Sequence, residues 1–251
     1  MVEGLVSIFC LTWERYDLTQ ATLTQNLSNI MKAAPYELLV CDQGSKDRRV
    51  VDFVAGTPNL VYHRKNKRNE GIGKSFNQLY LRSRGEFLCF MGSDLQMPKG
   101  WLQEMLGYVK GVPNSGMVGM DWGHSGVPPL TFQHGSHAHW LTPSLDRIFG
   151  CWIMRRKVVE EIGLFHEGFD VYGLEDSDFN ARVNLQGFKS LYVPNTHWKC
   201  KHVGTGTADS GEYRAMKDKS MAKNLPIFWE RYNNRYPGGL KEPLPEMRNE
   251  L

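Results

Sequence analysis

The sequence predicts an α/β protein with a mostly parallel central sheet flanked by helices and with a C-terminal helical tail. Two observations lead to this fold class. Short apolar runs of strand length recur along the chain, and the segments between them carry apolar residues at helical spacing. Strands that alternate with helices at such intervals form parallel sheets with right-handed crossovers. Ligands of such sheets bind at the carboxyl ends of the strands.

The first half of the chain alternates predicted strands with predicted helices. Residues 4–12 (GLVSIFCLT) are an apolar run of strand length, and apolar residues at helical spacing follow until Pro35 breaks the pattern. The other strands of this half are expected at residues 37–41, 60–63 and 86–91, and the helices at 18–30, 49–55 and 74–83. The loops after the strands are expected to converge on one site: residues 12–15, 42–47, 64–73 and 92–94.

The second half is less regular. Residues 121–146 are rich in glycine, proline and histidine, and a loop of this length is typical of a binding loop or a lid. Its strands are expected at residues 117–120, 149–154 and 190–193, and its helices at 101–110, 156–162, from about 175, and 212–232. The Pro/Glu-rich end of the chain is expected to fray.

Composition indicates a globular protein with ordinary apolar and charged fractions. A net charge of +3 suits an anionic ligand but falls short of a dedicated polynucleotide binder. We expect reduced, mostly buried thiols, because the five cysteines are widely spaced without a CxxC pair. The absence of a signal-like segment or a long apolar run predicts a cytoplasmic protein without a transmembrane segment, although peripheral membrane contact stays open. The cysteines are Cys10, Cys41, Cys89, Cys151 and Cys200.

An acidic segment at the expected helix start near residue 175 supplies the candidate base. Negative charge in a first helical turn is favoured by the helix dipole, and Asp178 can pair with Arg182 one turn later. Asp176 then remains near the mouth of the cleft that the preceding glycine loop opens, with Glu175 beside it. Asp176 is therefore the predicted general base.

Two further groups of residues suggest a metal site and an anion site. Asp94 follows a strand, where a carboxylate is well placed to hold a divalent cation, and His202 could complete that site. A helix cap for Asp94 and a hydrogen-bonded histidine are the structural alternatives. Basic residues surround the helix start at Lys74, where a phosphate would be favoured, but a solvated basic loop explains them equally well. A Walker A loop is excluded by spacing, because Arg68 stands where its first glycine should be.

The irregular loop holds two tryptophans and half of the chain's histidines. Trp122 and Trp140 would suit sugar rings or bases. Structural zinc is disfavoured, because no cysteine or carboxylate stands at ligand spacing beside these histidines.

Seven segments in order resemble the nucleotide-sugar transferases of glycosyltransferase family 2, which have the GT-A fold. Each segment matches a family motif, and the likeness runs from residue 5 to about residue 207. The segments are Leu11-Thr-Trp-Glu-Arg15, Val40-Cys-Asp-Gln-Gly-Ser-Lys-Asp47, Asn69-Glu-Gly71, Met91-Gly-Ser-Asp-Leu-Gln-Met-Pro-Lys-Gly-Trp101, Gly150-Cys-Trp-Ile-Met-Arg-Arg156, Ile162-Gly-Leu-Phe-His-Glu167 and Glu175-Asp-Ser-Asp178.

The resemblance implies a division of roles. Trp13 would stack on the nucleobase, Asp42 would hydrogen-bond it, Asp94 and His202 would hold Mn²⁺ or Mg²⁺, and Asp176 would deprotonate the acceptor. The expected donor-binding residues are Thr12, Trp13, Arg15, Asp42, Asn69, Gly71, Lys74, Ser93 and Asp94. The expected acceptor-facing residues are Trp122, Trp140 and Trp152.

The chain departs from the family pattern at three positions. Gly92 replaces the first acidic residue of D-x-D, which leaves the metal site with one carboxylate fewer. His166 replaces the aspartate of G-F-D-E, and Glu14 replaces an asparagine. The sequence itself suggests no role for His166 or Glu14.

The sequence therefore predicts an inverting glycosyltransferase that uses a nucleotide-sugar donor and a glycan, lipid-linked or modified nucleic-acid acceptor. Residues 1–210 would form one GT-A domain, with a nucleotide-sugar-binding half (1–98) and an acceptor-binding, catalytic half (99–210), followed by a helical extension (211–251). The alternatives are a nucleic-acid-binding protein, a transferase acting on modified DNA bases, and a nucleotidyltransferase, which is disfavoured because no G-x-G-T-R type loop is present.

Overall fold

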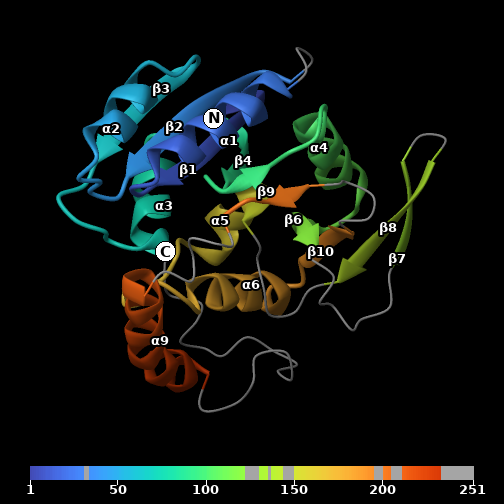
Figure 1. The fold of residues 1–251 in the computed structure, drawn as a ribbon. Helices are drawn as coiled ribbons and strands as arrows, with labels where there is room; N and C mark the ends of the chain where they lie inside the picture. The colour runs from blue at the N-terminus through green and yellow to red at the C-terminus, as the bar shows by residue number, and fades with distance from the viewer. Residues whose placement is uncertain are drawn as a thin grey trace.

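The computed structural model describes residues 1–30, 34–121, 130–134, 137–143, 150–194, 200–204 and 211–232. A nine-stranded sheet in the order β3-β2-β1-β4-β9-β6-β10-β8-β7 forms its centre, and β5 pairs with β11 in a separate two-stranded sheet (Figure 1). The strands are β1 (Val2–Thr12), β2 (Tyr36–Asp42), β3 (Leu60–Lys65), β4 (Gly85–Met91), β5 (Leu95–Gln96), β6 (Ser115–Asp121), β7 (Leu130–His134), β8 (His137–Pro143), β9 (Cys151–Arg155), β10 (Lys189–Pro194) and β11 (Lys201–His202).

The described helices agree with those expected from the sequence. They are α1 (Tyr16–Ser28), α2 (Arg48–Ala55), α3 (Ile72–Tyr80), α4 (Trp101–Gly111), α5 (Arg156–Ile162), α6 (Glu175–Leu185) and α9 (Gly211–Arg231). Within the described residues, no helix is both long and apolar enough to cross a membrane.

The sheet is mostly parallel, as predicted, but two of its described strands, β8 and β9, run in the opposite direction. β2 and β4 both run parallel to β1, β3 runs parallel to β2, and β10 runs parallel to β6. β9 lies between β4 and β6 and is antiparallel to both. Parallel neighbours need a crossover that returns the chain to the same end of the sheet. Along the chain the β7–β8 hairpin lies between β6 and β9, and in the sheet it forms the edge beyond β10, with which β8 pairs antiparallel.

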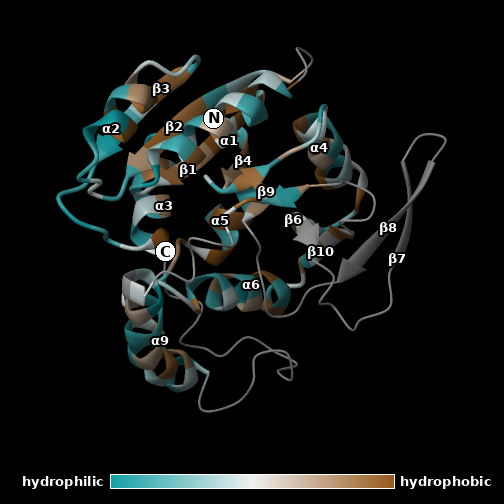
Figure 2. Ribbon diagram, viewed as in Figure 1, coloured by the Kyte–Doolittle hydropathy of each residue, from teal (hydrophilic) through white to brown (hydrophobic). Residues whose placement is uncertain are grey.

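Two apolar cores fill the spaces on either side of the sheet. In β1, Val6, Ile8 and Cys10 face one core, and Phe9 faces the other, because alternate side chains of a strand point to opposite faces. Helices α1, α2 and α4 contribute to the first core, and α3, α5 and α6 contribute to the second. Figure 2 shows the resulting apolar strands at the centre of the fold.

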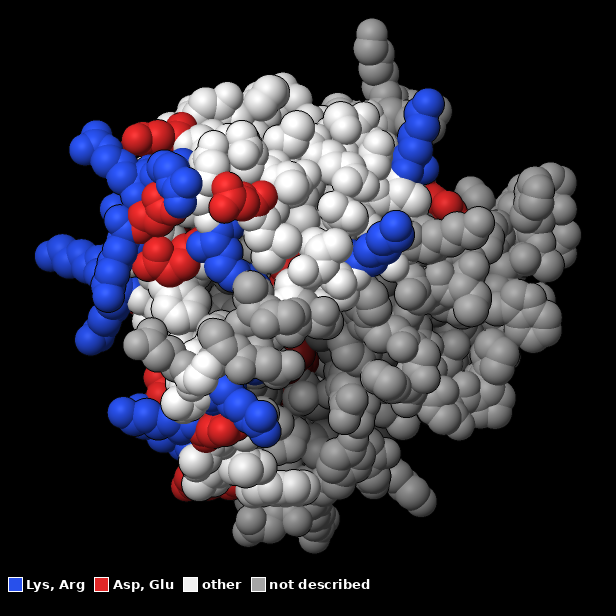
Figure 3. All heavy atoms as spheres, viewed as in Figure 1, with Lys and Arg blue, Asp and Glu red and all other residues white. Residues whose placement is uncertain are grey.

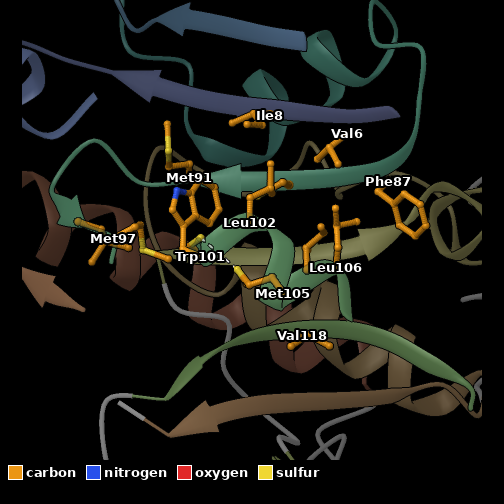
Figure 4. Close-up of a cluster of buried hydrophobic side chains, with 14 of the residues drawn as sticks. Val6, Ile8, Phe87, Met91, Met97, Trp101, Leu102, Met105, Leu106 and Val118 are labelled. Carbon is orange, nitrogen blue, oxygen red and sulfur yellow. Dashed lines mark hydrogen bonds between the residues drawn. The ribbon is translucent and has the colours of Figure 1, made fainter. Parts of the chain in front are cut away.

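Helix α4 closes the first core. Trp101, Leu102 and Met105 are fully buried and point towards the sheet, with Met91 of β4 above them (Figure 4). The indole Nε1 of Trp101 donates a 3.0 Å hydrogen bond to the carbonyl of Asn26 on α1. The tryptophan therefore joins two helices on the same face of the sheet while its ring fills the core.

A buried carboxylate attaches the C-terminal helix to the domain. Asp178 of α6 is fully buried and accepts hydrogen bonds from Nε of Arg182 at 3.0 Å, Nε of Arg231 at 2.8 Å and the hydroxyl of Tyr232 at 3.1 Å. The predicted Asp178–Arg182 pair is thus confirmed. Arg231 and Tyr232 extend it to α9, which lies beside α6 in Figure 1.

Replacing Asp178 with Asn should destabilise the protein strongly. Two guanidinium groups would lose their buried counter-charge, and breaking a buried ion pair costs about 3–5 kcal/mol. Urea unfolding should report this loss. Asp52→Asn is the matched control, because the Arg48–Asp52 pair is 3.6 Å long and mostly exposed, and such pairs contribute about 0–1 kcal/mol. Equal effects of the two substitutions would contradict the prediction.

Candidate active site at the carboxyl edge of the sheet

Hydrogen bonds join the loop after β1 to the loop after β2. The backbone N–H of Glu14 donates to Oγ of Ser45 at 2.7 Å, and the Glu14 carboxylate accepts from the backbone N–H groups of Lys46 at 2.8 Å and Asp47 at 3.2 Å. Glu14 therefore has a structural reason to differ from the family pattern: a carboxylate can accept both backbone donors of the neighbouring loop.

Asp42, at the end of β2, holds the same region from inside. Its side chain is fully buried and accepts four hydrogen bonds: from the backbone N–H groups of Gly44 at 3.2 Å and Ser45 at 2.9 Å, and from the hydroxyls of Thr12 at 3.0 Å and Ser45 at 2.6 Å. These contacts fill the acceptor sites of a carboxylate. Asp42 therefore joins the end of β1 to the loop after β2 from below the surface of the site.

The loop after β3 is tied to the same edge through Gln43. Its amide donates to the carbonyl of Gly71 at 3.0 Å and to Oγ of Ser75 at 2.6 Å, while Asn69 Oδ1 accepts from the Gly71 N–H at 3.0 Å. Gly71 has φ of 89°, and a Cβ there would lie 3.1 Å from Cα of Val171. Only glycine adopts this backbone freely and admits the neighbouring loop so closely.

Helix α1 positions the segment that carries Asp94. Thr22 Oγ1 donates to the carbonyl of Ser93 at 2.6 Å, Asn26 donates to the carbonyl of Leu95 at 2.7 Å, and the Met97 N–H donates to Asn26 Oδ1 at 2.8 Å. Thr22 and Asn26 are four residues apart, so they share one face of the helix. The four predicted loops therefore do converge at the carboxyl edge of the sheet.

Asp94 lies between two basic side chains. Its Oδ2 is 3.4 Å from an amino nitrogen of Arg15 and 3.5 Å from Nε2 of His202, which reaches the site because β11 pairs with β5. Burial by itself would raise the pKa of the Asp94 carboxyl, but the hydrogen bonds and charges of His202 and Arg15 lower it below its usual value. Asp94 therefore stays ionised at neutral pH.

This arrangement agrees with the chemistry of a divalent cation site. One carboxylate oxygen and one imidazole nitrogen form a donor pair that suits a transition metal such as Mn²⁺ better than Mg²⁺, which prefers oxygen ligands. Within the described residues, no cluster of three or more histidine, cysteine, aspartate or glutamate side chains is positioned to hold a metal. A cation held by Asp94 and His202 would therefore need further ligands from the donor diphosphate or from water.

The missing first acid of the D-x-D segment has a steric explanation. A Cβ at Gly92 would lie 2.8 Å from the carbonyl oxygen of Gly150 and 3.2 Å from Oδ1 of Asp94. The Gly92 N–H also donates to that carbonyl, and the two backbones are therefore in direct contact. Gly204 packs on the other side of Asp94, where a Cβ would lie 2.7 Å from its carboxylate. Two glycines thus enclose the one remaining carboxylate.

The predicted catalytic carboxylates begin α6. They follow Gly173 with φ of 96° and Leu174 with φ of 72°, while Glu14 and Arg15 have φ of 51° and 55° on the other side of the site. Non-glycine residues in this region cost about 1–3 kcal/mol each and cluster at functional sites. The strained backbone therefore coincides with both groups of predicted site residues.

Asn224 of α9 holds the loop that leads to these carboxylates. It is fully buried, its Oδ1 accepts from the Asp170 N–H at 2.6 Å, and its amide donates to the carbonyls of Tyr172 at 3.1 Å and Gly173 at 2.7 Å. The C-terminal helix thus determines where α6 starts. Sequence reasoning missed Asn224, since a lone asparagine on a helix carries no distinctive pattern.

Glu175 and Asp176 have different environments. Glu175 is 3% exposed, and its Oε2 has no hydrogen-bond partner among the described residues. Asp176 is half-buried and accepts from the Ser177 N–H at 2.8 Å. Burial, together with the charge of Asp176, raises the pKa of Glu175 to about 8. Glu175 is therefore mostly neutral at pH 7, which limits charge repulsion with Asp176.

Tyr172 links the two groups of acidic residues. Burial and the charges of Asp176, Glu175 and Asp94 raise the pKa of its hydroxyl to about 12. Tyr172 precedes α6 by three residues, and its ring contacts that of Tyr213, which contacts Trp13 at the carboxyl edge of the sheet. Asp94 and Asp176 therefore belong to one site, although they are far apart in the sequence.

The start of α9 covers this site with aromatic and basic side chains. The rings of Trp13 and Tyr213 have centroids 5.9 Å apart, and those of Tyr172 and Tyr213 are 6.5 Å apart. Nζ of Lys217 lies 4.4 Å from the Tyr172 centroid and 5.2 Å from the Tyr213 centroid. Sequence reasoning missed Tyr172, Tyr213 and Lys217. The four-residue spacing of Tyr213 and Lys217 puts both on one helix face, which is a signal that could have been found.

The other predicted site residues fall into three groups. Lys74 lies half-buried in the first turn of α3, on the donor side. Trp122 and the side chain of Trp140 lie outside the described residues. The expectation that residues 121–146 form an irregular loop is wrong for part of this segment, because β7 and β8 pair there as antiparallel strands. Trp152 is 4% exposed and packs against Phe76, Phe90, Phe165 and Phe179, so its contacts are those of a core residue.

The structure also shows the environments of the cysteines and of His166. All five cysteines are free and buried, as predicted. His166, for which the sequence suggests no role, packs edge-on against Phe169 with centroids 5.4 Å apart. A Cβ at Gly168 would lie 2.5 Å from its Nε2, so His166 occupies the space that Gly168 leaves.

This fold and site define the class of GT-A glycosyltransferases, and comparison with known proteins agrees. Residues 7–163, more than half of the chain, match Glycosyl transferase family 2. The chain therefore belongs to glycosyl transferase family 2.

Similarity to individual proteins is more distant. The chain is 24% identical to human polypeptide N-acetylgalactosaminyltransferase 12 across 92% of this chain and 46% of that protein, so it spans about half the length of this curated relative. The crystal structure of GalNAc-T7 with UDP, GalNAc and Mn²⁺ matches with a TM-score of 0.60 and 13% identity, covering 75% of this chain and 42% of that one. The mannosyltransferase PcManGT from Pyrobaculum calidifontis, in complex with GDP-Man and Mn²⁺, matches with a TM-score of 0.54 and 15% identity, covering 76% and 55%.

The pKa of Glu175 predicts a pH-dependent effect of Glu175→Gln on stability. The folded protein keeps this proton up to about pH 8, whereas the unfolded chain releases it near the ordinary value of 4.5. Wild-type stability should therefore fall through this group as pH rises between these values. Glutamine cannot ionise, so the stability of Glu175→Gln relative to wild type should increase from pH 5 to pH 8, measured by urea unfolding.

Asp170→Asn is the control, because the pKa of Asp170 is lowered in the folded protein whereas that of Glu175 is raised. The hydrogen bond and charge of Lys223 lower the pKa of Asp170, so its contribution is complete above the unfolded value of 3.8. The difference between Asp170→Asn and wild type should therefore stay constant from pH 5 to pH 8. A constant difference for Glu175→Gln as well would contradict the raised pKa.

Proposed function

We propose that this protein transfers a sugar from a nucleoside-diphosphate sugar to an acceptor hydroxyl with inversion at the anomeric carbon, and that Asp176 is the general base. The observation that carries this proposal is the position of Tyr172. Tyr172 lies just before α6, which carries Asp176, and its ring contacts Tyr213. Tyr213 contacts Trp13 in the loop that also brings Arg15 to Asp94. A donor bound near Asp94 would thus place its sugar next to Asp176.

The donor would bind along the carboxyl edge of the sheet. Trp13 would stack on the base, while Thr12 and Asp42 would keep the loop beneath it in place through their 3.0 Å hydrogen bond. Asn69, Gly71, Lys74 and Ser93 would line the donor side. Arg15, which already contacts Asp94, would offset negative charge on the diphosphate. Residues 1–98 would then form the donor half and residues 99–210 the acceptor half.

The reaction needs one base and one leaving group. Asp176 takes the proton of the acceptor hydroxyl while the oxygen attacks the anomeric carbon. The bond from that carbon to the diphosphate breaks on the opposite face, and its electron pair leaves with the nucleoside diphosphate. Glu175, neutral below about pH 8, lets Asp176 carry the negative charge that a base requires.

Asp94 and His202 would hold a divalent cation, for which Mn²⁺ fits the donor pair best. When bound, such a cation offsets the charge that develops on the leaving diphosphate. The structures of GalNAc-T7 and PcManGT, which were determined with Mn²⁺, support this assignment. With one carboxylate instead of two, the site is expected to bind the cation more tightly when the donor is present.

The acceptor is proposed to be a glycan, a lipid-linked sugar or a modified nucleic acid. The last of these draws support from the exposed basic residues of α2, of the end of β3 and of the segment after β3 (Figure 3). A polyanionic acceptor would lose affinity steeply as salt increases, whereas a neutral glycan would not. The basic residues are Arg48, Arg49, Arg64, Lys65, Lys67 and Arg68.

Asp176→Asn should abolish most turnover without preventing donor binding. Loss of a general base lowers kcat by about 10²–10⁴-fold. The assay is release of nucleoside diphosphate in the presence of acceptor, after a panel of nucleotide sugars has been screened for thermal stabilisation. Asp170→Asn, in the preceding loop, should keep near wild-type turnover, because the Asp170 side chain pairs with Lys223 at 2.7 Å.

Two results would count against the mechanism. Normal turnover by Asp176→Asn would remove Asp176 from the role of base. A product with the same anomeric configuration as the donor, measured by NMR, would exclude a single inverting displacement. Either result would leave the family and the fold unchanged.

Removing either proposed metal ligand should weaken Mn²⁺ dependence. Asp94→Ala and His202→Ala are each expected to lose the extra thermal stabilisation that Mn²⁺ adds in the presence of nucleoside diphosphate. Wild-type activity should fall with EDTA and return with Mn²⁺. If wild type, Asp94→Ala and His202→Ala all retain equal activity in EDTA, the metal site is wrong.

A further inference from the structure

The C-terminal helix places an aromatic ring directly on a predicted donor residue. Tyr213, in the first turn of α9, has its centroid 5.9 Å from that of Trp13, and the two ring planes are inclined by 36°. Helix α9 lies outside the part of the chain that matches the family, residues 7–163. A contribution of Tyr213 to the donor site would therefore come from outside the segment that matches the family.

We propose that Tyr213 forms the second face of the nucleobase site, so that the base of the donor stacks between Trp13 and Tyr213. This inference rests on the proposed function, because it assumes that Trp13 binds a base. Both rings are half-buried, which leaves part of each surface accessible. Two aromatic faces suit a purine or a pyrimidine, since every base has a π-face.

The surroundings of Tyr213 agree with this position. Its ring contacts Trp13, two residues before Arg15, and Arg15 reaches Asp94 at 3.4 Å. Tyr172 packs edge-on against it at 6.5 Å, and Nζ of Lys217 lies 5.2 Å from its centroid. These contacts position the Tyr213 ring and place a cation beside it.

The rings of Trp13 and Tyr213 must move apart by a small distance to admit the base. Two stacked contacts of about 3.5 Å each need rings about 7 Å apart, so the present distance between the Trp13 and Tyr213 centroids must increase by roughly 1 Å. The first turn of α9 can supply this movement, because Gly211 and Arg214 are exposed. The helix is anchored further along, by Asn224 and by the contact of Arg231 with Asp178.

The test is calorimetric titration of the full chain with UDP, GDP and inorganic pyrophosphate. For Tyr213→Ala, the Kd of the preferred nucleoside diphosphate should rise by between about 5-fold and 150-fold, the range for loss of one base–aromatic stack. Tyr213→Phe should stay within about 3-fold of wild type, because it keeps the ring. Pyrophosphate, which has no base, should bind Tyr213→Ala and wild type equally.

Arg214→Ala is the matched control, since it changes the neighbouring exposed residue of the same helix turn. Tyr213→Leu, which keeps apolar bulk without an aromatic ring, replaces Tyr213→Ala if the latter does not fold. If Tyr213→Ala and Tyr213→Leu bind nucleoside diphosphate with wild-type affinity while Trp13→Ala loses affinity, the role of Tyr213 is wrong and the proposed function is unaffected. An equal loss of pyrophosphate affinity would also overturn the role of Tyr213. Failure of the wild-type protein to bind any nucleoside diphosphate would overturn the proposed function as well.

Discussion

The Asp178 carboxylate is buried without solvent contact, and its charge is balanced by Arg182 from its own helix and by Arg231 from α9. Such a charge is tolerated only where ionic and hydrogen-bonding partners surround it. The same interaction therefore fixes the position of α9 against α6. Much of the candidate site follows from this docking, because α9 carries Asn224, which holds the loop before the proposed catalytic carboxylates, and Tyr213, which contacts Trp13.

The site itself is a meeting of loops held by backbone hydrogen bonds. Glu14, Asp42 and Gln43 have their side chains occupied by neighbouring loops. These contacts satisfy backbone groups that a buried loop would otherwise leave unpaired. They also keep Arg15 and Leu174 in backbone conformations that are rare for residues other than glycine. A rigid, partly strained edge of this kind is a suitable support for groups that must bind a charged donor.

Packing and hydrogen bonds in the structure explain the three departures from the family pattern. Gly92 cannot carry a side chain without moving the backbone of Gly150, so the site retains only the Asp94 carboxylate of D-x-D. Arg15 and His202 then flank that carboxylate. Glu14 exchanges an amide for a carboxylate that binds two N–H groups, and His166 fills space beside Phe169. None of these reasons is visible in a motif, because each depends on a neighbour distant in the chain.

The sequence alone determined the described helices and seven of the strands in their order, the Asp178–Arg182 pair and the convergence of four loops, because these depend on apolar periodicity, helical spacing and the geometry of parallel sheets. It did not predict β5, β7, β8 and β11, which are short or lie in a segment rich in glycine, proline and histidine. It also determined the family, through seven short motifs in order. Only the tertiary structure decided the reversed direction of β9, the burial of Trp152 and the presence of α9 over the donor edge. These features arise from contacts between residues far apart in the chain, such as Trp13 with Tyr213, and local sequence patterns carry no information about such pairs.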